Sequence, residues 1–299
     1  MERGGSTLVG TSPLSEGYMT LSIVIPSRNP DHCTQLIAQC RAYGYRDIVV
    51  VHPAGTPAPS HAQSITTDGL VSAAEARNRG AAASTGEYLF FVDDDVRFLT
   101  DVPRRLADCL QSPHISAVGA VIHDASENDY WVRCLHRVMA AGQHITRIRH
   151  TPALLLSMAL LVRRRDFVAC QGFDTTYAGA AGEDADLSIR MAQYGHLYVL
   201  PQAGISHHPT PAGWWSATRR MFGYGCIWPT VVRRNPQLAS PLHQLARGWA
   251  FAILLASPLL ALITCLRLRP RLPYLLGCWW LQWCWTIGVA HAHWHDHAQ

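Results

Sequence analysis

Residues 88–95, YLFFVDDD, carry the strongest indication of the fold, because an apolar run there ends abruptly on three carboxylates. Such a run predicts a buried strand, and in open α/β sheets ligands bind beyond the carboxyl ends of the strands. Adjacent carboxylates repel one another unless a cation lies among them, and their oxygens suit Mg²⁺ or Mn²⁺. In an extended chain Asp93 and Asp95 face one side and can share an ion, while Asp94 turns away. The alternative interpretation is an acidic surface turn.

A second acidic motif, GEDADLSIR, occupies residues 182–190 and begins an apolar helical pattern. Acidic residues are favoured in a first helical turn by the helix dipole, so simple capping is the alternative here. Three carboxylates, on Glu183, Asp184 and Asp186, exceed what a cap requires. A carboxylate held at this position is a candidate general base.

The chain of 299 residues is long enough for one sizeable core, and alternating strand and helix patterns favour a single α/β domain. Strands are expected at 24–25, 48–51, 89–92, 117–122 and 154–162, and helices at 31–43, 71–83, 102–111 and 183–194.

Several motifs occur in a fixed order and together resemble the family 2 glycosyltransferases, which have the GT-A fold. The resemblance runs from about Leu21 to about Pro209. Its motifs are SIVIPSRN at 22–29, Gly69, ARN at 76–78, Gly80, FVDDD at 91–95, GFD at 172–174, GEDADLSIR at 182–190, and His207. The fold class that this implies is α/β with a mixed, mostly parallel sheet and flanking helices.

The resemblance also implies a mechanism and a set of site residues. Asp95, with Asp93 and His207, would hold Mn²⁺ or Mg²⁺ on the diphosphate of a nucleotide sugar. Asp184 would take the proton of the acceptor hydroxyl in one displacement that inverts the anomeric carbon. Residues expected to bind the nucleotide are Pro26, Arg28, Arg77, Asp93 and Asp94, and those expected on the acceptor side are Glu183, Asp186 and Trp214. As alternatives, Arg28 and Arg77 are surface ion-pair partners and His207 is a structural histidine.

One position departs from the family pattern. Where the family usually closes its second strand with an aspartate, residues 48–53 read IVVVHP and place His52 there. A histidine is a poorer acceptor for an N–H donor of the base. A UDP-sugar is the favoured donor, and GDP- and dTDP-sugars stay open.

Residues 220–225, RMFGYG, and 233–236, RRNP, look like the mycofactocin-type branch of the family. That resemblance adds a peptide-derived acceptor to lipid-linked and cell-envelope glycans. Two other classes stay as alternatives: a nucleotidyltransferase that makes nucleotide sugars, and a catalytically inactive GT-A-like membrane scaffold. A nucleotidyltransferase should carry a glycine-rich phosphate loop after its first strand, where this chain has PSRNP at 26–30.

Composition supports an intracellular, non-nucleic-acid role. The nine cysteines include no C-x-x-C pair, which argues against a zinc or disulfide framework and suits a reducing cytoplasm. A net charge of +4 without a basic stripe makes nucleic acid an unexpected partner. Residues 1–19 have no secretory leader and are expected to form a loose tail.

The last third of the chain changes character. Residues 248–266 and 272–290 are two apolar stretches that approach the roughly 20 residues of a membrane span, and buried helices of a soluble oligomer are the alternative. The expected organisation is a tail (1–19), a GT-A domain (20–210), a basic and aromatic connector (211–247), a membrane-associated helical hairpin (248–290) and a His-rich disordered tail (291–299). Tryptophans of the hairpin suit a membrane interface, so the enzyme is expected at the cytoplasmic face of the membrane, with a transmembrane helix or an interfacial hairpin.

Overall fold

The computed structural model describes residues 20–124, 129–145, 147–148, 151–152, 154–177, 181–209, 213–236, 259, 262 and 272–296. The expected tail of residues 1–19 lies outside the described residues. So do residues 248–266, the first half of the expected hairpin, apart from Leu259 and Leu262.

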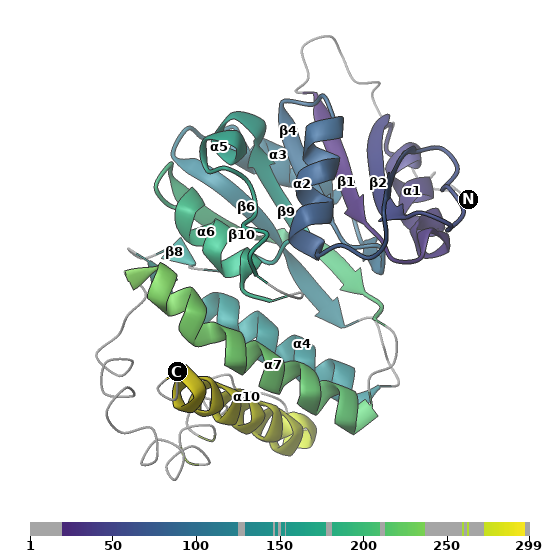
Figure 1. Ribbon diagram of the computed structural model, residues 1–299. Coiled ribbons are helices and arrows are strands. Elements are labelled where there is room, and N and C mark those ends of the chain that lie inside the picture. Colours follow the sequence, from purple (N-terminus) through teal and green to yellow (C-terminus); the bar gives the residue numbers. More distant parts are fainter. Residues whose placement is uncertain are drawn as a thin grey trace, which may run out of the picture.

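A mixed sheet of eight strands forms the centre of the molecule, in the order β3-β2-β1-β4-β9-β6-β10-β5 (Figure 1). Strands β3, β2, β1 and β4 pair in parallel, as do β6 and β10, whereas β9 runs antiparallel between β4 and β6 and β5 runs antiparallel to β10. The predicted mixed α/β sheet is therefore confirmed. The strands are β1 Leu21–Pro26, β2 Asp47–Pro53, β3 Gln63–Thr67, β4 Tyr88–Val92, β5 Val96–Phe98, β6 Ile115–Asp124, β9 Ala159–Arg163 and β10 His196–His207, with a small separate pair, β7 Arg147–Ile148 and β8 Thr151–Pro152.

Helices cover both faces of the sheet, and alternating side chains of each central strand meet a different helical layer. Ile23 and Ile25 pack with α1 and α3 on one face, whereas Val24 belongs to the opposite cluster with α2, α5 and α6. Both faces of β4 are covered, which explains why all five of its residues are buried. The helices are η1 Pro30–His32, α1 Cys33–Ala42, α2 Ala73–Ala83, α3 Val102–Leu110, α5 Arg164–Ala169 and α6 Glu183–Met191.

The strand expected at 154–162 is wrong in its first half, because β9 begins only at Ala159. The Leu155 N–H donates to Ser188 Oγ at 2.9 Å, and the Ser157 N–H donates to Asp184 Oδ2 at 3.2 Å. These backbone groups bond to side chains of α6 and are not available for a strand ladder. Residues 154–158 thus connect the sheet to the second acidic motif.

Three further helices pack against one another below the sheet in Figure 1: α4 Tyr130–Ile145, α7 Gly213–Arg234 and α10 Leu275–Asp296, the last preceded by η3 Leu272–Tyr274. They share a cluster of buried residues that includes Leu135, Met221 and Leu281. Helices α7 and α10 cross with backbones touching, since a Cβ on Gly225 would meet the Trp285 carbonyl oxygen and one on Gly288 would meet that of Phe222.

The expectations for the C-terminal region need two corrections. Helix α10 extends through His291 to Asp296, so the expected disordered tail over 291–299 is wrong up to residue 296; the His291 ring packs 5.5 Å from that of Phe222. The expected transmembrane helix is not supported: within the described ranges, none of the helices combines the length and apolarity that crossing a bilayer requires.

Candidate active site

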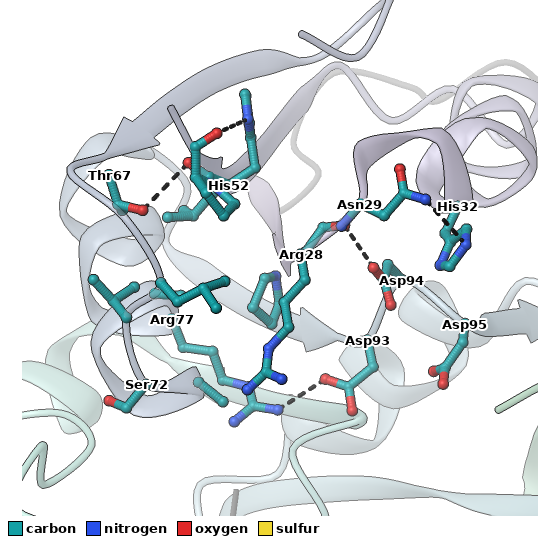
Figure 2. Close-up of a pocket in the computed structure, with 18 of the residues that line it drawn as sticks. Arg28, Asn29, His32, His52, Thr67, Ser72, Arg77, Asp93, Asp94 and Asp95 are labelled. Atoms are coloured by element: carbon teal, nitrogen blue, oxygen red, sulfur yellow. Dashed lines mark hydrogen bonds and ion pairs between the residues drawn. The ribbon is translucent and has the colours of Figure 1, made fainter. Parts of the chain in front are cut away.

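A pocket of about 660 Å³ opens beyond the carboxyl ends of β1, β2 and β4 (Figure 2). Its lining includes Pro26, Pro53 and Thr67, the last residues of β1, β2 and β3, and Arg28, which follows β1. Parallel strands end together at this edge, so residues far apart in sequence converge here. Figure 2 shows the exposed Arg28 side chain pointing into the same space as the Arg77 guanidinium, and both line the pocket.

The three aspartates after β4 point to three different partners. Asp93 Oδ1 accepts a hydrogen bond from Arg77 Nη2 at 2.8 Å, and Asp94 Oδ2 accepts one from Ser27 Oγ at 2.5 Å. Asp95 Oδ2 lies 3.2 Å from His207 Nε2. Residues 94–95 form a turn rather than an extended segment, and Asp94 binds Ser27 instead of a partner of Asp93 or Asp95. Figure 2 shows the three aspartates side by side.

Burial and mutual repulsion give these carboxylates different acidities. Burial, helped by the charges of Asp95 and Asp93, raises the pKa of Asp94 to about 6. The hydrogen bond from Ser27 acts in the opposite direction. For Asp95, burial alone would raise the pKa, but the hydrogen bond and charge of His207 outweigh it and lower the pKa below its ordinary value. Asp95 therefore stays ionised beside the histidine.

Arg77 joins the two acidic motifs. Its buried guanidinium contacts Asp93 on one side and Glu183 Oε1, at 3.3 Å, on the other, and it lies 5.5 Å from the Phe173 ring centroid. Burial alone would lower the pKa of Arg77, whereas Asp93, Asp184 and Glu183 raise it above its ordinary value. Because both terminal nitrogens of Arg77 already bind carboxylates, a contact between Arg77 and the nucleotide stays a prediction.

The second acidic motif forms the first turn of α6, which begins after Gly182 at a φ of +92°. Burial raises the pKa of Asp184, and it raises that of Glu183 to about 8 with the help of the Asp184 charge, against the charge of Arg77. Asp184 Oδ1 is buried and has no hydrogen-bond partner within the described part of the chain. An ionised Asp184 would thus have one oxygen available for a substrate hydroxyl.

Asp186 differs from its two neighbours. Its carboxylate forms an ion pair with Arg190 at 2.6 Å and accepts a hydrogen bond from Asn235 Nδ2 at 3.2 Å. Arg190 belongs to α6 itself and Asn235 follows α7, so these contacts stabilise the helix and its packing. The expected acceptor-side role of Asp186 has no geometric support beyond its position in the motif.

His207 ends β10 beside the first acidic motif and contacts a second histidine. Its Nδ1 lies 2.7 Å from Nε2 of His136 in α4, with the two ring centroids 4.9 Å apart. Asp95 Oδ1, on the other side of His207, is buried and has no hydrogen-bond partner among the residues that the structure describes.

These donors suit a divalent cation, because a carboxylate oxygen without a partner and an imidazole nitrogen converge at the rim of the pocket. Asp95 and His207 are the adjacent pair, and Asp93 is engaged with Arg77. Among the described side chains, no group of three or more histidine, cysteine, aspartate or glutamate residues is already arranged to hold a metal ion. Metal binding would therefore require Asp93 or a ligand outside the protein to complete the shell.

Trp214 and His52 were singled out in the sequence, Trp214 for the acceptor side and His52 as a departure from the family pattern. Trp214 begins α7, is 47% exposed and packs against Trp280 rather than lining the pocket. His52 is buried, and its ring nitrogens lie 2.7 Å from Thr56 Oγ1 and 2.5 Å from Ser64 Oγ. Both nitrogens are thus engaged inside the protein, which accounts for a histidine at this position without a nucleotide contact.

Several residues at the site were not predicted from the sequence. Ser27 binds Asp94 and Ser157 binds Asp184. The Asn78 side chain donates to the Phe173 carbonyl oxygen at 2.8 Å and accepts from the Phe173 N–H at 2.9 Å. Tyr224 of α7 is in the electrostatic field of Asp184, and burial raises its pKa. Tyr224 and Arg220 are four residues apart on one helix, a spacing that places both on the same face.

Comparisons with known proteins are consistent with this arrangement. A family model described as glycosyltransferase like family 2 matches residues 60–223, more than half of the chain. Pre-mycofactocin glycosyltransferase of Mycobacterium tuberculosis, matched in two strains, is 29% identical over 258 residues, covering 77% of this chain and 51% of that protein. The chain thus spans about half the length of these curated relatives.

Solved structures share the fold. The mannosyltransferase PcManGT of Pyrobaculum calidifontis, in complex with GDP-Man and Mn²⁺, gives a TM-score of 0.62 at 19% identity and covers 94% of this chain and 88% of its own. Glucosyl-3-phosphoglycerate synthase of Mycobacterium tuberculosis, with Mn²⁺, UDP-Glc and phosphoglyceric acid, gives 0.51 at 16% identity, covering 72% and 79%. At such identities the likeness establishes a common architecture.

Proposed function

Since the chain belongs to the glycosyltransferase like family 2, we propose that it is an inverting, metal-dependent enzyme that moves a sugar from a nucleotide-sugar donor to an acceptor hydroxyl. The observation that carries this proposal is the junction of the two acidic motifs. Asp93 and Glu183 share the Arg77 guanidinium at the rim of the pocket, so donor-side and acceptor-side carboxylates lie on either side of one buried cation.

On the donor side, the proposal assigns the pocket to the nucleotide diphosphate. Pro26, Arg28, Arg77 and Asp94 line it, and Arg28 is exposed with its guanidinium directed inward. A guanidinium suits phosphate oxygens because it offers paired N–H donors. UDP-sugars are the favoured donors, and GDP- and dTDP-sugars are the alternatives.

Asp95 and His207, with Asp93, would hold the Mn²⁺ or Mg²⁺ ion. A divalent ion bound there supplies charge neutralisation for the leaving diphosphate. Support comes from Asp95 Oδ1, which has no hydrogen-bond partner among the described residues, and from the lowered pKa of that carboxyl. The Mn²⁺ in the neighbouring structures' own complexes adds to this support.

On the acceptor side, Asp184 is the proposed general base. The Ser157 N–H fixes Oδ2, and Oδ1 has no partner among the described residues, so that oxygen would accept the acceptor hydroxyl proton. The attack then occurs from the side of the sugar opposite the diphosphate, which inverts the anomeric centre. Tyr224 lies in the electrostatic field of Asp184 and Glu183, and we assign Glu183 and Tyr224 to the acceptor site.

The proposed acceptor is a cell-envelope glycan, a lipid-linked group or a peptide-derived cofactor. The peptide-derived class draws support from the similarity to pre-mycofactocin glycosyltransferase, which holds over half of that relative's length. We also propose that the enzyme works at the cytoplasmic face of a membrane and contacts its interface. Exposed Trp214 and Trp215, with Arg219 at 5.7 Å from the Trp215 ring, support this contact.

Calorimetric titration with UDP, GDP and dTDP, each with and without Mn²⁺, tests the proposal. Metal-dependent binding of one nucleotide is expected, lost in Asp95→Asn and retained in Asp108→Asn, which removes an exposed carboxylate of α3. Asp184→Asn should bind the same nucleotide normally but release UDP from a UDP-sugar about 10²- to 10⁴-fold more slowly, with water as the acceptor.

The same experiment separates the alternatives. Failure of every nucleotide to bind would favour the inactive scaffold. Release of pyrophosphate from a nucleoside triphosphate and a sugar phosphate would favour a nucleotidyltransferase. Full turnover in Asp184→Asn would show that the base is another group.

A further inference from the structure

His136 is a buried polar residue that the proposed reaction does not use. It lies in α4 with 4% of its surface exposed, in a helix whose neighbouring Cys134, Leu135 and Val138 pack into the apolar cluster with α7 and α10. Its Nε2 is 2.7 Å from His207 Nδ1, and His207 in turn contacts Asp95. A chain of three side chains thus runs from the α4 helix to the proposed metal site.

We infer that His136 is a positioning residue that fixes the ring orientation and tautomer of His207, so that His207 presents Nε2 to a divalent cation beside Asp95. This inference rests on the proposed function, because it concerns the cation assigned to that site. It assigns a role to α4, an element outside the sequence motifs.

The chemistry of two adjacent imidazoles explains the assignment. A hydrogen bond between two neutral ring nitrogens contains one proton, which belongs either to His207 Nδ1 or to His136 Nε2. When it belongs to His207 Nδ1, the Nε2 atom keeps its lone pair and can ligate a cation, which would take the place of the Nε2–H proton that otherwise bonds to Asp95 Oδ2. A hydrogen-bond acceptor at Nδ1 therefore selects the ligating tautomer, as the outer partners of metal-bound histidines commonly do.

A purely structural role for His136 is the competing interpretation, and the packing argues against it. The apolar neighbours on α4 already supply the contact with α7 and α10, so an aliphatic residue would fill the same place without the cost of burying an imidazole. The imidazole is instead directed at His207, whose own ring contacts the Asp95 carboxylate. His207 is itself only 7% exposed, so its ring has little freedom to find another partner.

Binding of Mn²⁺ alone to the purified full-length chain, followed by the electron paramagnetic resonance signal of the free ion, tests this inference. His136→Leu should weaken Mn²⁺ affinity about 10- to 100-fold, the usual effect of removing such a partner. His136→Gln should restore most of the affinity, because its amide oxygen can accept from Nδ1–H. Val138→Ala, which creates a cavity two positions further along the same helix, should lower the melting temperature without changing Mn²⁺ affinity.

Each outcome separates this inference from the proposed function. Wild-type binding that is lost in Asp95→Asn but equal in all three α4 variants would overturn the role of His136 and leave the metal site intact. Equal weakening in His136→Leu, His136→Gln and Val138→Ala would reduce that role to packing. If the wild type binds Mn²⁺ only when UDP is present, the same comparison of variants is made with UDP. If it binds none in either case, or if Asp95→Asn binds it as well as the wild type, the metal site itself is wrong.

Discussion

Glu183 is a carboxyl group that the fold holds away from water in the first turn of α6. Its pKa is raised from the ordinary 4.5 to about 8, so between these values the folded chain binds a proton that the unfolded chain has lost. The contribution of Glu183 to the free energy of unfolding therefore falls as pH rises through this window. One pKa unit corresponds to about 1.4 kcal/mol, so the effect is on the order of a few kcal/mol.

Urea unfolding at a series of pH values from 4.5 to 8 measures this effect as a difference between variants. Glu183→Gln should show a flatter decline than the wild type, because the glutamine has no proton to lose. Glu87→Gln, a change at an exposed glutamate, should follow the wild-type curve. Parallel curves for the wild type and Glu183→Gln would mean that Glu183 titrates at its ordinary pKa.

Single residues also mark the limit of what the sequence could predict. Asp93, Asp95, Asp184 and His207 were each identified from a local motif, and the first three lie at the ends of the predicted strand and helix. The partners of these residues were not predictable, because they come from packing. Arg77 meets Glu183 across 106 positions of sequence, a contact that exists only once α2 and α6 lie on the same face of the sheet.

At the scale of elements, β4 and α6 are confirmed, because β4 is an unbroken apolar run and α6 begins directly with its acidic first turn. The strand expected at 154–162 failed where side chains of α6 compete for its backbone groups. Helix α10 was predicted as half of a membrane hairpin because its composition is apolar on several sides. Composition alone cannot distinguish a helix covered by lipid from one covered by α4 and α7.

The crossing of α7 and α10 depends on two glycines, which leads to a prediction about these helices. Gly225→Ala places a methyl group against the Trp285 carbonyl and should push the helices apart, lowering the free energy of unfolding by about 1–3 kcal/mol. Gly223→Ala, two residues away in α7 with open space around it, should instead stabilise by up to about 1 kcal/mol through helix propensity. Urea unfolding of both variants checks this. A gain in stability for Gly225→Ala would mean that the helices are not in backbone contact.

At the scale of the whole molecule, the layer of α4, α7 and α10 borders the pocket side of the sheet. It carries residues near the proposed site and exposed residues on its outer surface. Tyr224 lies in the electrostatic field of Asp184 and His136 contacts His207, whereas Trp214 and Trp215 are exposed at the start of α7. Trp215 and Tyr224 lie on the same helix, α7, so one element joins the proposed membrane contact to the proposed acceptor site. This arrangement suits an enzyme whose acceptor is held at an interface.

Membrane contact can be measured by sedimentation with lipid vesicles. Trp215 is 60% exposed and Trp214 47%, and indole rings favour the headgroup region, while Arg219 beside Trp215 would attract anionic lipid. The full-length chain should therefore sediment more with vesicles of phosphatidylcholine and phosphatidylserine than with phosphatidylcholine alone, and added salt should weaken this binding. The double variant Trp214→Ser and Trp215→Ser should bind less, whereas Val168→Ser, a change at an exposed apolar residue of α5, should bind as the wild type does.

Residues 237–271 are also apolar in large part, so the role of α7 is measured by the difference between these variants rather than by total binding. Equal sedimentation of the wild type and the double variant would remove α7 from the membrane contact and leave its tryptophans as packing for α10.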